Sequence, residues 1–334
     1  MTRERFIRQR RNDWRKFEEL LLHLKSTRAS KWSSGDVSDL ARLYRSICYD
    51  LSLVQSREWG MRLERYLNDL VAQGHNCLYR TQPVSFKVVT RFLGVRFPQL
   101  LRHYHTAFFV AIALFVVPFV VCTWIGYQRP DLAELIAGKA ATDEAIENFG
   151  TDKYTKFDEV YAGQRSMMAG FYIRNNIGIA FQAFALGMFF GIGTAWVLLS
   201  NAIATGMVTG YLWHHGGDAW LNFSSFVITH GAFELTAIVV SGAAGIVLGT
   251  SIVWPGQRTR RDSIRHRGKH ALEITLGAGV MLLIAAMIEG FFSPMPIDPL
   301  IKYIAGTFAW VGVIAYLGLT GRGASPIAFD EETV

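Results

Sequence analysis

The chain has 334 residues, of which 51% are hydrophobic, and it carries a formal net charge of +7. A mean hydropathy of +0.21, together with long uncharged stretches, excludes an ordinary soluble protein. The positive charge does not by itself indicate a nucleic-acid partner, because membrane proteins concentrate Lys and Arg in their cytoplasmic loops. We expect no nucleic-acid partner. We also expect no secretory signal peptide, because the basic start MTRERFIRQRRNDWRKF has no apolar central region.

The first 106 residues are basic, with 20 Lys and Arg against 10 Asp and Glu, and have no apolar run of spanning length. Apolar residues at helical spacing predict three helices, over 11–26, 37–56 and 58–79. Ser34 and Asp36 are candidate caps for the second helix. The pattern predicts a cytoplasmic helical domain over residues 1–82.

Residues 83–106 form an amphipathic juxtamembrane segment that begins where Pro83 breaks the helical pattern. Val84, Val88 and Phe92 fall on one side of a helix, with the basic residues on another. This pattern predicts either a helix lying in the inner headgroup layer or an ordinary helix packed on its own domain.

Long apolar stretches then follow in order, over 107–127, 177–213, 226–254, 271–290 and 300–320. The second has 37 residues and contains no Asp, Glu, Lys, Arg or His. One helix of that length would be roughly 55 Å long, whereas the hydrocarbon core of a bilayer is about 30 Å thick. The stretch therefore predicts two tight helices or a re-entrant hairpin, with its reversal near Ser200, Asn201 and Ala202.

Charges in the connecting segments predict the orientation. The segment after Trp254 carries six basic residues against Asp262, so we expect it in the cytoplasm. Residues 128–170 carry eight acids against five bases and are expected outside. Parity then predicts about six crossings with both termini cytoplasmic, or five if the hairpin is re-entrant. The expected fold is an all-α polytopic helical membrane protein, with a transmembrane domain over 107–320 and a cytoplasmic tail over 321–334.

A few polar residues are predicted to lie inside the bilayer. His230 and Glu234 are four residues apart and share a helix face, and the topology places Glu289 in the same outer half. The predicted intramembrane polar cluster consists of His230, Glu234, Glu289, Asn175, Asn176 and Asn201. Buried ionisable groups normally face a partner or a wet cavity. The group is interpreted either as a structural pair that orients helices or as part of a proton or solute pathway.

Glycines at small-xxx-small spacing predict close helix contacts. The predicted packing positions are Gly187, Gly191, Gly193, Gly206, Gly210, Gly245 and Gly249. Such faces would also allow a homodimer.

Catalytic signatures are missing from the sequence. No Ser/His/Asp or Cys/His arrangement stands out, and no glycine loop followed by Lys suggests phosphate binding. His230, Glu234 and Glu289 together could supply three metal ligands, but the HExxH order of zinc proteases is absent. We expect no enzymatic activity, no cofactor and no metal site.

Several segments together resemble the stage II sporulation protein M family of bacterial integral membrane proteins. The first domain contributes LYRSICYDL and RYLNDLVAQGHNCLY. The membrane part contributes FYIRNNIGIAFQAFALGMFFGIGT, SNAIATG, HGAFELTAIVVSGAAGIVLG and IEGFFSP. The resemblance implies a sporulation-related role in engulfment, within a membrane complex that contains a peptidoglycan-degrading enzyme and a second cell-wall protein. It also implies that this chain anchors and localises such partners without cutting the wall.

Two functions are therefore carried forward. The first is a non-enzymatic scaffold or assembly factor of a cell-envelope complex in the bacterial cytoplasmic (inner) membrane. It would bind the lipid bilayer and other envelope or peptidoglycan-remodelling proteins. The alternative is a small transporter or channel that uses His230, Glu234 and Glu289.

Overall fold

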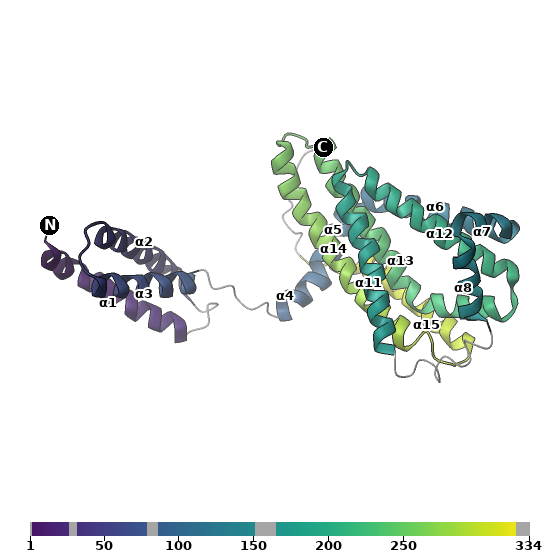
Figure 1. Ribbon diagram of the computed structural model, residues 1–334, viewed down its shortest axis with the longest axis horizontal. Coiled ribbons are helices and arrows are strands. Elements are labelled where there is room, and N and C mark those ends of the chain that lie inside the picture. The colour runs from purple at the N-terminus through teal and green to yellow at the C-terminus, as the bar shows by residue number, and fades with distance from the viewer. Residues whose placement is uncertain (1, 27–31, 79–85, 151–164, 325–334) are drawn as a thin grey trace. The chain divides into compact units, whose positions relative to one another are not determined.

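The computed structural model describes residues 2–26, 32–78, 86–150 and 165–324, and these residues form helices and no strand (Figure 1). The predicted all-α fold is confirmed. The chain splits into two compact units, Met1–Val88 and Val89–Val334. The division falls inside the predicted juxtamembrane segment, and each unit is described by itself below.

The N-terminal unit is built from α1 (Arg3–Ser26), α2 (Ser34–Ser56) and α3 (Met61–Leu78). At the start of α2, Ser33 Oγ accepts a hydrogen bond from Asp36 N at 3.1 Å, and Asp36 Oδ2 accepts one from Ser33 N at 2.9 Å. The bond from the Ser33 backbone N–H to the Asp36 carboxylate lowers the pKa of Asp36. Together the two bonds form a capping box, so the helix cap is Ser33 and the prediction of Ser34 was wrong by one residue.

The three helices bury their apolar faces against one another. The buried core includes Phe6, Trp14, Phe17, Leu21, Leu40, Ile47, Leu67 and Leu70. Asp50 lies within this core and accepts hydrogen bonds from Arg10 Nε at 2.9 Å and from Trp14 Nε1 at 2.8 Å. A buried carboxylate is tolerated because its oxygens are paired, and these bonds fix α1 against α2.

The membrane unit contains five helices that are long and apolar enough to cross a bilayer: α6 (His105–Gln128), α12 (Ile192–His215), α13 (Gly217–Val253), α14 (Arg260–Phe291) and α15 (Pro299–Leu319). A further helix, α11 (Arg165–Ala185), has 21 residues and would be roughly 32 Å long. It is less apolar because it carries Arg174, Asn175 and Asn176. The count of five apolar helices plus α11 agrees with the predicted range of five to six crossings.

Contacts between these helices fix their relative directions. Gly206 and Gly210 lie against the backbone at Phe119 and Thr123, so α12 runs parallel to α6. Thr194 Oγ1 donates to Ala183 O at 2.7 Å across the reversal, so α11 runs antiparallel to α12.

The same reasoning orders the other three helices. Gly242 lies against Leu198 and Gly245 against Thr194, which makes α13 antiparallel to α12. Ser293 lies beside Thr229 and Leu248 beside Gly268, which makes α14 antiparallel to α13. Tyr303 lies beside Ser224 and Gly306 beside Ile228, so α15 runs parallel to α13. Three helices therefore run each way, which is the arrangement that the parity argument requires.

The reversal inside the long uncharged stretch lies at residues 186–191, where a 3-10 helix (Leu186–Met188) is followed by a turn in which Phe190 and Gly191 have φ values of +57° and +82°. The predicted reversal near Ser200, Asn201 and Ala202 was wrong, because all three lie within α12. Gly191 can adopt the left-handed conformation without a Cβ clash, which explains why the chain turns there.

The juxtamembrane segment has two parts. The first, α4 (Phe86–Arg91), contains no buried residue; Val84 lies outside the described residues. A π-helical turn (Phe92–Arg96) leads into α5 (Phe97–His103), whose first half is buried in the membrane unit. The Phe97 ring lies against Gly277, and the Arg102 guanidinium donates to Leu317 O at 2.6 Å and Thr320 O at 2.7 Å. A cation at the unsatisfied carbonyls of a helix end is favourable, so α5 ties the middle of α14 to the end of α15.

Two short helices of the predicted outer segment pack on the other ends of the bundle. They are α7 (Pro130–Ala137) and α8 (Lys139–Phe149). Tyr211 Oη donates to Glu134 Oε1 at 3.1 Å, and Asn222 Nδ2 donates to Phe149 O at 3.0 Å. Residues 151–164 of this segment and 325–334 of the tail lie outside the described residues.

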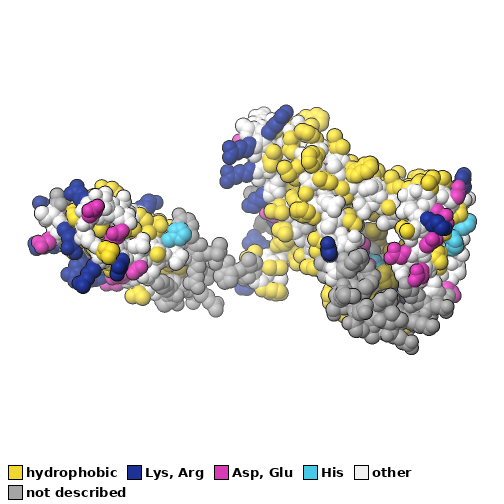
Figure 2. All heavy atoms as spheres, viewed as in Figure 1, with side chains coloured by type: hydrophobic (Ala, Val, Ile, Leu, Met, Phe, Trp, Pro, Cys, Tyr) yellow, Lys and Arg dark blue, Asp and Glu magenta, His cyan; other side chains and the backbone are white. Residues whose placement is uncertain are grey.

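The surface of the membrane unit changes in composition from one end of its helices to the other (Figure 2). Hydrophobic side chains cover the sides of its helices. Dark-blue Lys and Arg gather at the end where α14 begins, whereas Asp, Glu and His gather at the end that carries α7 and α8. This distribution is typical of a helical bundle that crosses a bilayer.

Adding a methyl group by Gly→Ala substitution should affect stability differently at glycines in helix contacts and at glycines on the open surface. Gly245→Ala places a Cβ onto Ala183 O and Thr194 Oγ1, so we expect a loss of about 1–3 kcal/mol in the free energy of unfolding. Gly312 also lies within a helix but has no atom within 4 Å of its Cβ position. Gly312→Ala should stabilise α15 by up to about 1 kcal/mol. Thermal unfolding in mild detergent measures both, and equal effects would contradict the packing.

Candidate functional site

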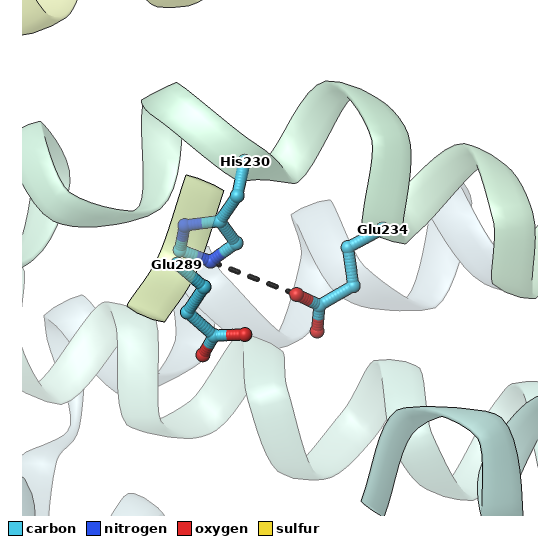
Figure 3. A group of neighbouring side chains, drawn as sticks. All are labelled: His230, Glu234 and Glu289. Atoms are coloured by element: carbon cyan, nitrogen blue, oxygen red, sulfur yellow. Dashed lines mark ion pairs between the residues drawn. The ribbon is translucent and has the colours of Figure 1, made fainter. Parts of the chain in front are cut away.

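The candidate site is a buried group of three ionisable side chains between α13 and α14. His230 and Glu234 project from the same face of α13, and Glu289 projects toward them from α14 (Figure 3). One ligand atom of each residue lies within 4.8 Å of the others, and His230 Nε2 is 3.6 Å from Glu234 Oε2. The predicted meeting of these three residues is therefore present in the fold.

Hydrogen bonds around His230 assign its tautomer. Thr229 Oγ1 donates to Phe226 O at 2.7 Å, so Thr229 must accept the proton of its 2.5 Å contact with Ser293 Oγ. Because a hydroxyl has one proton, Ser293 Oγ then accepts from His230 Nδ1, which lies 3.1 Å away. The proton of a neutral imidazole is thus on Nδ1, and the lone pair of Nε2 points toward the two carboxylates.

The carboxylates have the opposite problem. Glu234 Oε2 and Glu289 Oε2 are both buried and have no hydrogen-bond partner among the described residues. The Glu289 residue is only 7% exposed. Buried carboxylates without donors are unfavourable unless a cation or a proton neutralises them. The site therefore holds two buried carboxylate oxygens, Glu234 Oε2 and Glu289 Oε2, that no described donor reaches.

A third helix, α15, begins near the same end of the bundle and contributes Lys302. Lys302 is 1% exposed, and its Nζ donates to Ser293 O at 2.8 Å. This bond ties α15 to the segment that follows α14. The sequence reasoning singled out neither Lys302 nor Ser293 nor Thr229. The available signal was the single Lys inside the apolar stretch 300–320, because a charge at such a position normally has a partner.

The three asparagines of the predicted cluster form hydrogen bonds with groups other than His230, Glu234 and Glu289. Asn175 Nδ2 donates to Asn176 Oδ1 at 3.1 Å, so these neighbours on α11 bond to each other. Asn201 Nδ2 donates to Val197 O at 2.8 Å within α12. No hydrogen bond of the described residues joins them to His230 or the carboxylates, and their part in the site stays a prediction.

The predicted packing glycines lie at close contacts within the membrane unit. Gly187 faces Gly245, and Gly191 faces Gly249, so the reversal before α12 packs directly on α13. The remaining predicted packing positions, Gly193, Gly206 and Gly210, lie against the backbone of Leu186, Phe119 and Thr123. These glycines therefore serve contacts within the membrane unit, and the homodimer stays a prediction.

A separate groove opens between α6, α13 and α15, with a volume of about 630 Å³. Phe108, Ile112, Leu235, Trp310 and other apolar side chains line it, and it does not include the His230 group. Its lining fits hydrocarbon better than a polar solute.

Comparisons with known proteins bear on the membrane unit and the N-terminal unit separately. Residues 107–294 match the family model described as Stage II sporulation protein M, and this range includes His230, Glu234, Glu289 and Ser293. The match covers more than half of the chain, so the protein belongs to this family. Residues 4–80 match a domain of unknown function (DUF8413). No curated protein and no solved structure matches the chain.

Ser293 should stabilise the bundle through its side-chain hydroxyl. Ser293→Ala removes the partner of both His230 Nδ1 and Thr229 Oγ1, so we expect a loss of about 1–3 kcal/mol. In the control Ser200→Ala, the lost hydroxyl bonds only Val197 O of its own helix, at 3.2 Å, and the loss should be below about 0.5 kcal/mol. Thermal unfolding of the purified protein compares the two. Equal stability of the Ser293 variant and the unaltered protein would argue against the assigned bonds.

Proposed function

We propose that this member of the stage II sporulation protein M family is a non-enzymatic scaffold or assembly factor of a cell-envelope complex. The observation that carries the proposal is that folded structure exists outside the apolar helices in two separate places, α1–α3 and α7–α8. The α1–α3 unit has its own buried core, and α7 and α8 pack on the opposite side from the basic end of α14. Such separate units are suited to holding partners on the two faces of a membrane.

The proposed location is the bacterial cytoplasmic membrane, with both termini in the cytoplasm. Basic residues support this orientation, because the first turns of α14 carry Arg260, Arg261 and Arg265, and such clusters stay on the cytoplasmic side. The acidic helices α7 and α8 would then face outward. The antiparallel order of the helices requires an even number of crossings if α11 also spans, which places both ends on one side.

The proposed partners are envelope or peptidoglycan-remodelling proteins, as the family resemblance implies. The N-terminal unit offers a basic surface to a cytoplasmic partner, since α1 alone carries exposed Arg3, Arg5, Arg8 and Arg11. The outer helices offer exposed acids, including Asp143 and Glu144. Opposite charge on the two faces would let each face select a different partner.

Deletion of residues 1–80 tests the cytoplasmic half of this proposal. Because the α1–α3 core is formed within that unit, the membrane unit should keep its thermal unfolding temperature and elute as one species. In-membrane crosslinking followed by mild solubilisation should then recover fewer cytoplasmic partners than from the full chain. The matched change Asp143→Asn with Glu144→Gln should lower recovery of outer partners only. Unchanged partner recovery after the deletion would refute a cytoplasmic scaffold role.

Transport is a second candidate, and the convergence of His230, Glu234 and Glu289 within the bundle favours it. Ionisable groups at such depth are a feature of proton and ion pathways. If protons move through this group, Glu234→Gln should abolish proton flux into liposomes followed by a pH-sensitive dye. The control Glu144→Gln, an exposed acid on α8, should leave flux unchanged. Absence of flux from the unaltered protein would eliminate this candidate.

A further inference from the structure

His230, Glu234 and Glu289 present an electrostatic problem that the described protein atoms do not solve. Ionised carboxylates only accept hydrogen bonds, and the assigned tautomer of His230 turns a third acceptor, Nε2, toward them. The three ligand atoms lie within 4.8 Å of one another, and one oxygen of each carboxylate has no hydrogen-bond partner. Three acceptors facing one point need a positive charge among them.

We propose that His230, Glu234 and Glu289 bind one divalent first-row transition-metal ion, of the class of Zn²⁺ or Mn²⁺. The ion would join α13 to α14 inside the membrane unit. This site is independent of the scaffold proposal, because it concerns the contact between α13 and α14 and not the binding of partner proteins.

Ligand spacing fits such an ion. Two ligand atoms about 2.1 Å from a common tetrahedral ion lie roughly 3.4 Å apart. His230 Nε2 and Glu234 Oε2 are 3.6 Å apart, which needs almost no movement. The ligand atom of Glu289 is within 4.8 Å of the other two, so it would have to move closer by up to about 1.4 Å to reach the ideal spacing. One turn of helix supplies two ligands and the neighbouring helix supplies the third.

The surroundings of His230 match what a metal-bound imidazole needs. A ligating histidine usually donates its other ring N–H to a neighbouring group, which fixes the ring and leaves one nitrogen for the metal. Here the acceptor is Ser293 Oγ, itself held by Thr229. This second layer comes from α13 and the segment after α14, so the ring is oriented by the same two elements that the ion would join.

Charge balance selects a divalent ion. One neutral imidazole and two carboxylates leave the ligand set at two negative charges, which a divalent cation cancels. Net neutrality matters in a low-dielectric interior, where an uncompensated charge is strongly unfavourable. The imidazole nitrogen favours a transition metal, because Na⁺, Mg²⁺ and Ca²⁺ prefer sites made only of oxygen. The competing solution is protonation of the carboxylates without a metal, and the experiment separates the two.

Metal titration of the full chain is the direct test. Protein purified in mild detergent is stripped with a chelator, desalted, and titrated with Zn²⁺ and with Mn²⁺ by calorimetry, and bound metal is counted by mass spectrometry. We expect one ion per chain. Glu289→Gln and Glu234→Gln should each weaken binding by roughly 100-fold or more, because a ligand is removed where even a supporting residue contributes 10–100-fold.

Matched controls exclude binding elsewhere. Glu144→Gln makes the same chemical change at an exposed acid of α8, and His214→Ala removes an exposed histidine at the end of α12. Both should bind the ion as the unaltered protein does. If the His214 variant loses the ion while the Glu289 variant keeps it, the ion is held at the surface histidines and the proposed site is wrong.

Thermal unfolding adds a readout that a purely structural pair would not produce. In chelator, Glu289→Gln should unfold at the same or a higher temperature than the unaltered protein, because it removes one of two facing buried carboxylates. Added Zn²⁺ should raise the unfolding temperature of the unaltered protein and leave that of the variant unchanged. The proposal is overturned if the stripped protein takes up neither metal, or if both proteins respond equally.

Discussion

The membrane unit depends on how closely other helices can approach α13. Gly242, Gly245 and Gly249 leave the C-terminal half of α13 without side chains on the contact face, so that Leu198, Thr194 and the turn at Gly191 touch its backbone. A lipid environment offers no hydrophobic gain for bringing helices together, so contacts of this kind, van der Waals packing and hydrogen bonds must hold the bundle. The α11–α12 hairpin packs on α13 because these three positions carry no Cβ.

The N-terminal half of α13 is held in a different way. There the contact with α14 and α15 includes Thr229, His230, Ser293 and Lys302, joined by hydrogen bonds. Since each of these bonds has an apolar surrounding, losing one partner strands the other in a medium that cannot solvate it. One half of α13 thus contacts its neighbours through its backbone, and the other half contacts them through a network of polar side chains. Only the second kind of contact requires polar residues in the sequence.

Much of this arrangement was predictable from the sequence, for identifiable reasons. Charge distribution and stretch length gave the helix order, and i,i+4 spacing with parity brought His230, Glu234 and Glu289 to one depth. The reversal at residues 186–191 was missed because no charge or proline marks it, whereas the positive φ values of Phe190 and Gly191 in the structure reveal it. The roles of Ser293 and Lys302 were missed because they depend on which helix faces which, and a hydropathy pattern does not contain that information. The asparagines were grouped with the site by depth alone, and depth does not determine which side of a helix faces the cluster.

The polar group also has a physical connection to the outer helices. Phe149 at the end of α8 packs edge-on against Phe226, with ring centroids 5.5 Å apart, and Phe226 packs in the same way against His230 at 5.2 Å. Asn222 bonds the Phe149 carbonyl and anchors α8 to α13 over the same short interval. The α8 helix thus lies on a stretch of α13 that also contains His230, whose Nδ1 contacts Ser293 Oγ. A continuous series of contacts therefore runs from α8 through Phe226 to His230 and Ser293, so a change of packing around the buried carboxylates would reach α8 through only two aromatic contacts.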